Sequence, residues 1–217
     1  MKKKSLLLSP LQNSEFRARY GENYIKQYER QATQFLTIVR LYLKRQRDRV
    51  LDSLDNRVKS LEDEVFNLNL EIQLAKTEFL PFLEDILIRA GASAMLFQGS
   101  DFNFNLSSQL ATTLSKRVDL FTRSINETTF SKLKSEFTES FAEGETRDKL
   151  IKRVENVYGD ISKGRAQTIA RTEVQVANQT GIFGGYKQAG AQIKIWVWAP
   201  GIKGGVRDNH AAIDGEE

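Results

Sequence analysis

Four side chains in the last third of the sequence are suited to acid–base or metal chemistry: Glu173, Arg207, His210 and Asp214. The last three follow an R-x-x-H-x-x-x-D spacing, which would place them on one face of a helix. His210 is the only histidine and there is no cysteine, so a zinc site cannot be completed and we expect no metal and no cofactor. A carboxylate-rich magnesium site formed by Asp208, His210, Asp214 and Glu216 is the alternative.

Glu173 lies on the apolar stripe of a helix that the sequence predicts from Ser162 to about Gln188. A carboxylate on such a stripe is costly unless it is paired, so we expect Arg207 or His210 to be its partner. This pair would be structural and would fix the helix against a following strand. No nucleophile elbow, phosphate-binding loop or dinucleotide fingerprint is present, so we assign no catalytic residue and expect that the protein is not an enzyme.

Basic side chains are concentrated at the N-terminal end. Residues 1–50 hold 12 lysines and arginines against 4 acidic residues, although the whole chain has a formal net charge of only +4. Such a segment suits a DNA phosphate backbone or an acidic protein surface, and a solvated helix face is the third interpretation. The candidate residues for binding DNA or an acidic partner are Lys2, Lys3, Lys4, Arg40, Lys44, Arg45, Arg47 and Arg49.

Composition narrows the class of protein. The absence of cysteine excludes a disulfide framework and fits assembly in a reducing cytoplasm. The apolar run near Met1 is interrupted at Pro10, so we expect no signal peptide. No stretch approaches the roughly 18 to 20 apolar residues of a transmembrane helix, so we expect no membrane role.

The region from residue 14 to residue 90 contains few helix breakers and predicts long helices. Between Leu51 and Ile86 the apolar residues recur at alternating steps of three and four. This period near 3.5 is typical of a continuous helix that packs lengthwise against another helix in coiled-coil style. We expect Pro81 to kink or end that helix.

The predicted fold class is mainly α, with a small α+β domain at the C-terminal end. A basic arm covers residues 1–13, long helices with coiled-coil-like packing cover 14–90, a loop or linker covers 91–105, a helical segment covers 106–158, and the α+β domain covers 159–217. We expect a bend in the helical segment at Asn126 to Thr129, a break at Gly144 and a helix N-cap at Thr146. The alternating run from Ile193 to Trp198 predicts the strand of the α+β domain.

A combination of motifs in the C-terminal third resembles a known family. I-A-R-T-E at residues 169–173 is followed by a tryptophan and then by R-x-x-H-x-x-I-D-G at residues 207–215. In this order and spacing the motifs resemble the phage Mu F-like head morphogenesis proteins over about residues 145–217. The motif residues, which look like a signature of the family fold, are Arg171, Thr172, Glu173, Trp196, Arg207, His210, Asp214 and Gly215. Family members usually continue beyond the D-G pair, so we expect this domain to be shortened at its C-terminus.

The resemblance implies a minor capsid protein of a tailed phage, present in the virion head interior at the portal vertex and in the host cytoplasm during assembly. Its implied partners are the portal protein, other head proteins and packaged double-stranded DNA, and we expect it to be oligomeric or portal-bound. Its implied roles are procapsid assembly and DNA packaging or ejection. Two alternatives stay open. One is a metal-dependent nuclease or nucleotide-modifying enzyme centred on Glu173, Arg207, His210 and Asp214, and the other is a coiled-coil assembly factor that does not contact nucleic acid.

Overall fold

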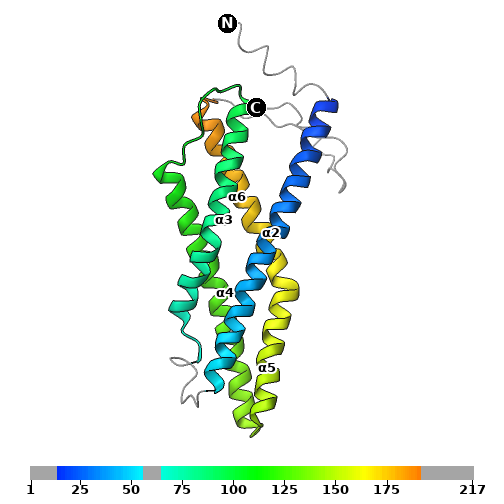
Figure 1. Ribbon diagram of the computed structural model, residues 1–217, viewed down its shortest axis with the longest axis vertical. Coiled ribbons are helices and arrows are strands. Elements are labelled where there is room, and N and C mark those ends of the chain that lie inside the picture. The colour runs from blue at the N-terminus through cyan, green and yellow to red at the C-terminus, as the bar shows by residue number, and fades with distance from the viewer. Residues whose placement is uncertain (1–13, 56–64, 192–217) are drawn as a thin grey trace, which may run out of the picture.

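The structure is a computed structural model that describes residues 14–55 and 65–191 (Figure 1). These residues form five α-helices and one π-helical segment, with no strand among them, so the mainly α class is confirmed for this part of the chain. The elements are α2 (Ser14–Asp55), α3 (Leu68–Phe97), α4 (Ser108–Ala142), α5 (Arg147–Asp160), the π-helical segment η2 (Ile161–Arg165) and α6 (Ala166–Gln188).

The helices form an elongated bundle of four rods that alternate in direction (Figure 1). The helices α2, α3 and α4 are one rod each, and α5, η2 and α6 follow one another to make the fourth. With 42 residues and about 1.5 Å of rise per residue, α2 is roughly 60 Å long. Each rod therefore packs lengthwise against its neighbours.

The predicted continuous helix over residues 51–86 is wrong. Asn67 is the N-cap of α3, and its side chain accepts a hydrogen bond from the Leu70 backbone N–H at 3.0 Å. Contacts between α2 and α3 show that the two helices are antiparallel, because Arg45 pairs with Glu78 whereas Arg49 pairs with Glu71. The heptad spacing therefore belongs to two helices whose apolar stripes face each other. Because the spacing is the same in both helices, it does not show where the chain turns between them.

Pro81 does not end the helix, since α3 continues through it to Phe97. Pro81 lies on the exposed side of α3, where the missing N–H donor and the ring disturb no packed neighbour. The predicted loop consequently begins only after Phe97. It ends at Ser107, whose hydroxyl oxygen accepts a hydrogen bond from the Leu110 N–H at 3.3 Å as the N-cap of α4.

The core of the bundle contains a row of aromatic rings contributed by three rods. Phe79 on α3 lies at its centre, with its ring centroid 5.5 Å from that of Phe35 and 5.3 Å from that of Tyr42, both on α2. The ring of Phe121 on α4 lies 5.8 Å away on the other side. Aromatic pairs at these separations add to the stability that burial alone provides.

The helix α4 runs without interruption through the polar residues where the sequence predicts a bend. Asn126 and Thr129 are buried, but their side chains donate to backbone carbonyls of their own helix, at 2.8 Å to Thr122 O and 2.9 Å to Ile125 O. Their polar atoms are thus satisfied without exposure to water. The predicted break at Gly144 is confirmed, with φ at +61°, and Thr146 is the N-cap of α5 but makes no side-chain capping hydrogen bond.

The predicted α+β domain at the C-terminal end is not supported. Its described part is helical from residue 159 to Gln188, and α6 packs along α3 and α2 inside the same bundle. A stripe of small residues lets a helix pack closely against any neighbouring element. The stripe on α6 is therefore compatible both with a separate domain and with a place in the bundle. The predicted strand from Ile193 to Trp198 lies outside the described residues.

Backbones of α6 and α3 approach each other closely at two glycines. A Cβ atom added to Gly181 would overlap the backbone carbonyl of Leu87, and one added to Gly185 would overlap the carbonyl of Gly91. Both glycines are buried, and they lie one helical turn apart on the same face of α6. The absence of a side chain at these two positions therefore sets the distance between the rods.

Replacing Gly181 or Gly185 by alanine will push α6 away from α3. We expect each change to lower the free energy of unfolding by roughly 1–3 kcal/mol, as overpacking of a close contact does. Urea denaturation followed by circular dichroism measures the effect. Gly159→Ala is the matched control, because a Cβ there meets no atom within 4 Å, and it should leave stability unchanged or raise it by up to about 1 kcal/mol.

Candidate functional site

The carboxylate of Glu173 on α6 forms a bidentate ion pair with the guanidinium of Arg117 on α4. Arg117 Nε donates to Glu173 Oε2 at 2.8 Å and Arg117 Nη2 donates to Oε1 at 2.7 Å. The Glu173 side chain is only 5% exposed, whereas that of Arg117 is 39% exposed. The hydrogen bonds to Glu173 raise the pKa of the Arg117 guanidinium. The pair therefore links α6 to α4, with the carboxylate buried in the bundle and the guanidinium partly exposed at its surface.

Glu173 is buried and paired, as its place on the apolar stripe predicts, and the described residues supply a cation, Arg117, that was not predicted. Arg207 and His210 lie outside the described residues, and both carboxylate oxygens of Glu173 are already engaged by Arg117. The pair with Arg117 thus fixes α6 against another helix, while the predicted contact with a strand lies outside the described residues. Arg117 directly precedes buried Val118 in α4, and a cation at the edge of an apolar stripe was the signal that could have identified it.

Two further residues of the I-A-R-T-E motif, Arg171 and Thr172, face outward, whereas Ala170 is buried in the core. Arg171 is exposed and pairs with Glu29 on α2 at 2.5 Å, and its backbone carbonyl accepts a hydrogen bond from the Tyr28 hydroxyl at 3.1 Å. Thr172 is exposed as well. Trp196, Arg207, His210, Asp214 and Gly215 lie outside the described residues. Within the described part, the motif therefore provides cross-links from α6 to α2 and α4.

A second polar cluster, which the sequence analysis did not identify, lies in the core where α2, α3 and α4 meet. The Tyr42 hydroxyl lies 2.7 Å from Asn126 Oδ1 and 3.1 Å from Glu71 Oε2. Gln46 Nε2 donates to the same two oxygens at 2.6 and 3.0 Å. Arg49 completes the cluster with a bidentate pair to Glu71, at 2.7 Å from Nε and 2.6 Å from Nη2.

Burial governs the ionisation of this cluster. Tyr42 is fully buried, and desolvation, reinforced by the Glu71 charge, raises the pKa of its hydroxyl far above the usual range. The pKa of the Tyr158 hydroxyl on α5 is raised by the same two causes, in the same order. Both phenols therefore stay neutral at any physiological pH. Hydrogen bonds to Glu71 raise the pKa of Arg49, so the Arg49 charge is permanent.

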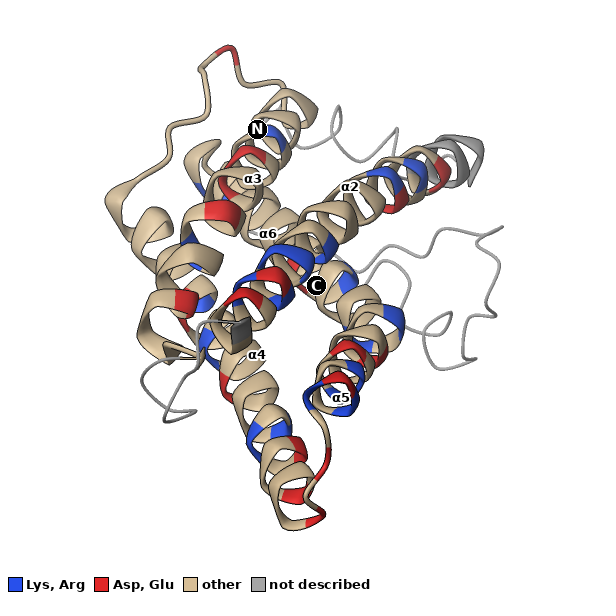
Figure 2. Cartoon of the chain, turned by 60° about the horizontal axis from the view of Figure 1, so that its bottom comes forward, with Lys and Arg blue, Asp and Glu red and all other residues tan. Residues whose placement is uncertain are grey.

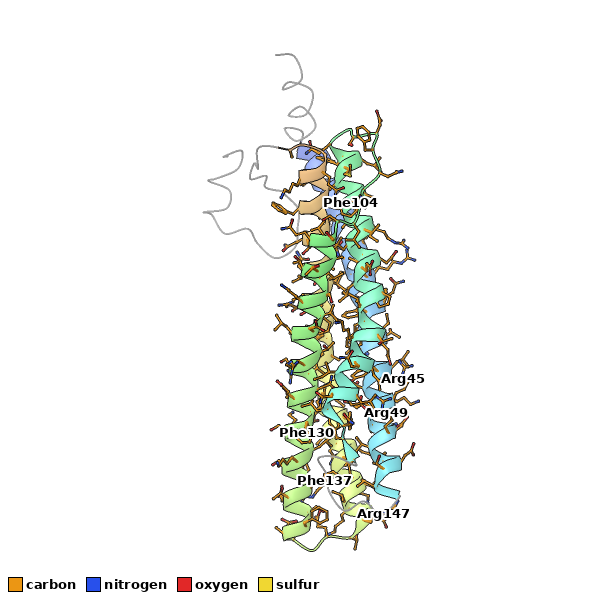
Figure 3. All side chains as sticks on the ribbon, turned by 90° about the vertical axis from the view of Figure 1, so that its left-hand side faces the viewer. Arg45, Arg49, Phe104, Phe130, Phe137 and Arg147 are labelled. Carbon is orange, nitrogen blue, oxygen red and sulfur yellow. The ribbon has the colours of Figure 1, made fainter. Side chains whose placement is uncertain are left out.

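Three of the basic residues assigned to DNA or partner binding are paired inside the protein. Arg45 is bound to Glu78 and Arg49 to Glu71, both on α3, and Arg47 contacts its neighbour Asp48 at 2.7 Å. Arg45 and Arg49 are labelled in Figure 3 on the side of the bundle where α2 meets α3. Their charge is largely neutralised locally, which makes them weaker candidates for phosphate than the sequence suggested. Lys2, Lys3 and Lys4 lie outside the described residues.

Arg40 and Lys44 are exposed on the outward face of α2, and two further cations extend their row. Lys26 and Arg30 precede them at helical spacing, so the four side chains lie along one edge of the rod, which we call the α2 basic stripe. Basic residues recur along α2 in Figure 2. From Lys26 to Lys44 the stripe is about 27 Å long at the usual rise per residue. Such a row can follow a polyanion over several phosphates.

The described residues contain no group of three or more histidine, cysteine, aspartate or glutamate side chains placed to hold a metal ion. Among the helices that the structure describes, none has the length and apolar character needed to cross a bilayer. An open depression of about 370 Å³ between α3 and α4 is lined by Leu80, Glu84, Leu114 and Lys116, among others. None of the ion pairs described above lies in it.

The described residues thus form an elongated helical bundle. It contains two buried carboxylates paired with arginine, Glu173 with Arg117 and Glu71 with Arg49, and it carries the α2 basic stripe on its outer surface. In a comparison with protein families, the family described as "Phage Mu protein F like protein" matches residues 131–217, which are less than half of the chain. The predicted resemblance to phage Mu F-like head morphogenesis proteins is confirmed over that range. Comparisons with curated proteins and with solved structures gave no match.

The family match begins inside α4, but the partners of its motif lie before the match. Glu173 pairs with Arg117, and Arg171 pairs with Glu29, which is on α2. Asn178 on α6 donates to Gln31 on α2 at 2.8 Å between two buried side chains. The family-like segment therefore depends on the preceding helices for the charges and amides that satisfy its buried polar groups.

Arg117→Met will leave the Glu173 carboxylate buried without its cation. We expect this change to lower the free energy of unfolding by roughly 1–3 kcal/mol, less than for a fully buried pair because Arg117 is partly hydrated. Arg171→Met removes an ion pair whose two side chains are about half exposed, and it should cost less than about 1 kcal/mol. Equal destabilisation of the two variants in urea would contradict the assignment of Glu173–Arg117 as the dominant pair.

A fragment of residues 131–217 tests the dependence of the family-like segment on the earlier helices. Without α2 and α3, the buried face of α6 has no surface to cover it, so we expect the fragment to lack cooperative thermal unfolding. Circular dichroism at 222 nm during heating measures this. Addition of a second fragment of residues 1–130 should restore cooperativity, and a sharp transition in the 131–217 fragment alone would show that it folds independently.

Proposed function

We propose that this chain is a minor capsid protein of a tailed phage that acts at the portal vertex in procapsid assembly and in DNA packaging or ejection. The observation that carries the proposal is the family match over residues 131–217, which indicates a phage head morphogenesis protein. The fold supports it, because a rigid rod roughly 60 Å long presents extended surfaces to neighbouring head proteins. The portal protein and other head proteins are the proposed partners.

Direct contact with double-stranded DNA is the second part of the proposal, and the α2 basic stripe supports it. Lys26, Arg30, Arg40 and Lys44 are exposed and none has an acidic partner in the described structure, unlike Arg45, Arg47 and Arg49. Cations of this kind release counterions when they meet phosphates, which gives sequence-independent and salt-dependent affinity. The basic N-terminal arm that contains Lys2, Lys3 and Lys4 would add to the same interaction.

Neutralising the stripe tests the DNA contact. Replacing Lys26, Arg30, Arg40 and Lys44 by glutamine should weaken binding to duplexes of different sequence alike. It should also reduce the slope of log K against log salt by about 0.9 for each phosphate that the protein no longer neutralises. Fluorescence anisotropy at several salt concentrations measures both effects. The matched control replaces four exposed lysines on other elements, Lys116, Lys132, Lys152 and Lys163, and should retain most of the affinity.

Co-assembly with the portal tests the first part. The chain, mixed with purified portal rings of the same phage, should sediment with the rings, and it should be found in particles at few copies per head. If it neither binds rings nor shows salt-dependent DNA binding, the proposal fails. Ring binding without DNA binding, or with an inert basic stripe, would instead favour an assembly factor that does not contact nucleic acid.

The enzymatic alternative is tested separately. A nuclease or nucleotide-modifying centre would require Glu173 to be available to a metal or substrate, whereas both of its carboxylate oxygens accept hydrogen bonds from Arg117. We therefore expect no cleavage of DNA in the presence of Mg²⁺ or Mn²⁺, with wild-type chain or with His210→Ala. Metal-dependent cleavage that His210→Ala abolishes would establish the enzyme.

A further inference from the structure

The fourth rod is held to the bundle differently along its two halves. The α6 half carries polar links to three other segments: Glu173 to Arg117 on α4, Asn178 to Gln31 on α2, and Gln188 to Asn105 in the loop before α4. The last link is reciprocal, with Asn105 N–H donating at 3.0 Å and Gln188 Nε2 donating to Asn105 O at 2.6 Å. Close backbone packing at Gly181 and Gly185 adds to these links.

The α5 half packs on the bundle through an apolar face and is tied by charge to α4. The buried face consists of Leu150, Val154, Val157 and Tyr158. Arg153 on the same helix pairs with Glu136 at 2.9 Å and with Glu145 at 2.6 Å, and these acids belong to the end of α4 and to the turn before α5. Figure 3 shows Phe137 and Arg147 at this end of the bundle, far from Phe104 at the other end.

Among the described residues, two buried polar atoms without a hydrogen-bond partner lie on the helices that meet at the polar cluster. They are Gln46 Oε1 on α2 and the Tyr158 hydroxyl oxygen on α5. The Tyr158 hydroxyl is close enough to Glu71 and Arg49 for both charges to act on its pKa. A buried polar atom without a partner destabilises the closed arrangement, because the same atom would be hydrated if the helices separated.

The segment that connects the two halves is π-helical. The segment η2 (Ile161–Arg165) contains Gly164, and Gly159 precedes it in the last turn of α5. A Cβ atom at either glycine would meet nothing within 4 Å, so neither glycine is required by packing. Glycine is among the poorest helix formers, and a π-helical turn inside a helix is frequently found at a functional site.

We propose that α5 opens by local unfolding between the turn at Gly144 and the η2 segment. The polar cluster around Glu71 and Arg49 is the boundary at which α5 separates from α2 and α3. Opening exposes the apolar face of α5, while α4 and α6 remain packed on α3.

Hydrogen–deuterium exchange with mass spectrometry on the full chain tests this opening. The backbone amides of α5 should exchange about 100-fold faster than those in the buried parts of α3 and α6, under conditions where the whole chain stays folded. Urea denaturation of the same sample gives the rate limit expected from global unfolding. Amides of α5 that exchange only at that global limit would overturn the proposal.

Two variants test the mechanism of the opening. Gly164→Ala stiffens the η2 segment without a steric clash, and it should slow exchange in α5 by about five-fold while leaving α6 unchanged. Tyr158→Phe removes the hydroxyl that has no partner and should slow exchange in α5 by a similar factor. Gln179→Ala, at an exposed position of α6, is the control and should not affect α5. Fast exchange in α5 that neither variant slows would overturn the role of η2 and of the cluster boundary.

Discussion

The bidentate contact between Glu173 and Arg117 is the constraint on which the arrangement of the described rods depends. Burying a carboxylate is unfavourable by itself, so Glu173 restricts where α6 can lie: Glu173 must reach a cation while Gly181 and Gly185, further along the helix, reach the backbone of α3. Only one rotation of α6 satisfies both requirements. The same rotation places Arg171 beside Glu29 and Asn178 beside Gln31, which fixes α2 relative to α6.

Much of the helical content could be predicted from the sequence, but the chain reversal could not. The apolar residues from Leu51 to Ile86 keep the same spacing on both sides of the turn, because both helices present a stripe to the same core. The end of α2 and the start of α3 are therefore invisible to periodicity, and only the capping of α3 by Asn67 marks the boundary. Pro81, in contrast, led us to expect an interruption where the helix continues, since a proline on the exposed side of a helix is tolerated.

The candidate site, like the fold, could be predicted from the sequence only in part. An acidic residue on an apolar stripe was sufficient to predict that Glu173 is buried and paired. Its partner was not predicted, because Arg117 lies 56 residues earlier in the sequence and only its place at the edge of an apolar stripe marks it. The basic residues of α2 were correctly located on one helix, but spacing alone does not distinguish a cation paired across the bundle, such as Arg45, from one without an acidic partner in the described part, such as Arg40. Glu71 and Gln46 could not be identified as site residues from the sequence, because the polar cluster they belong to forms only where α2, α3 and α4 meet.

The contacts of α6 with α2 and α3 join the first and last helices of the described chain, and this order matters during synthesis. A ribosome releases α2 and α3 long before α6, so the parts of their apolar stripes that α6 covers remain exposed until translation has passed Gln188. Native pairing between such distant segments is slow relative to local helix formation. The nascent chain is therefore sensitive to aggregation for most of its synthesis, and holdase chaperones or early association with a partner protein would protect it.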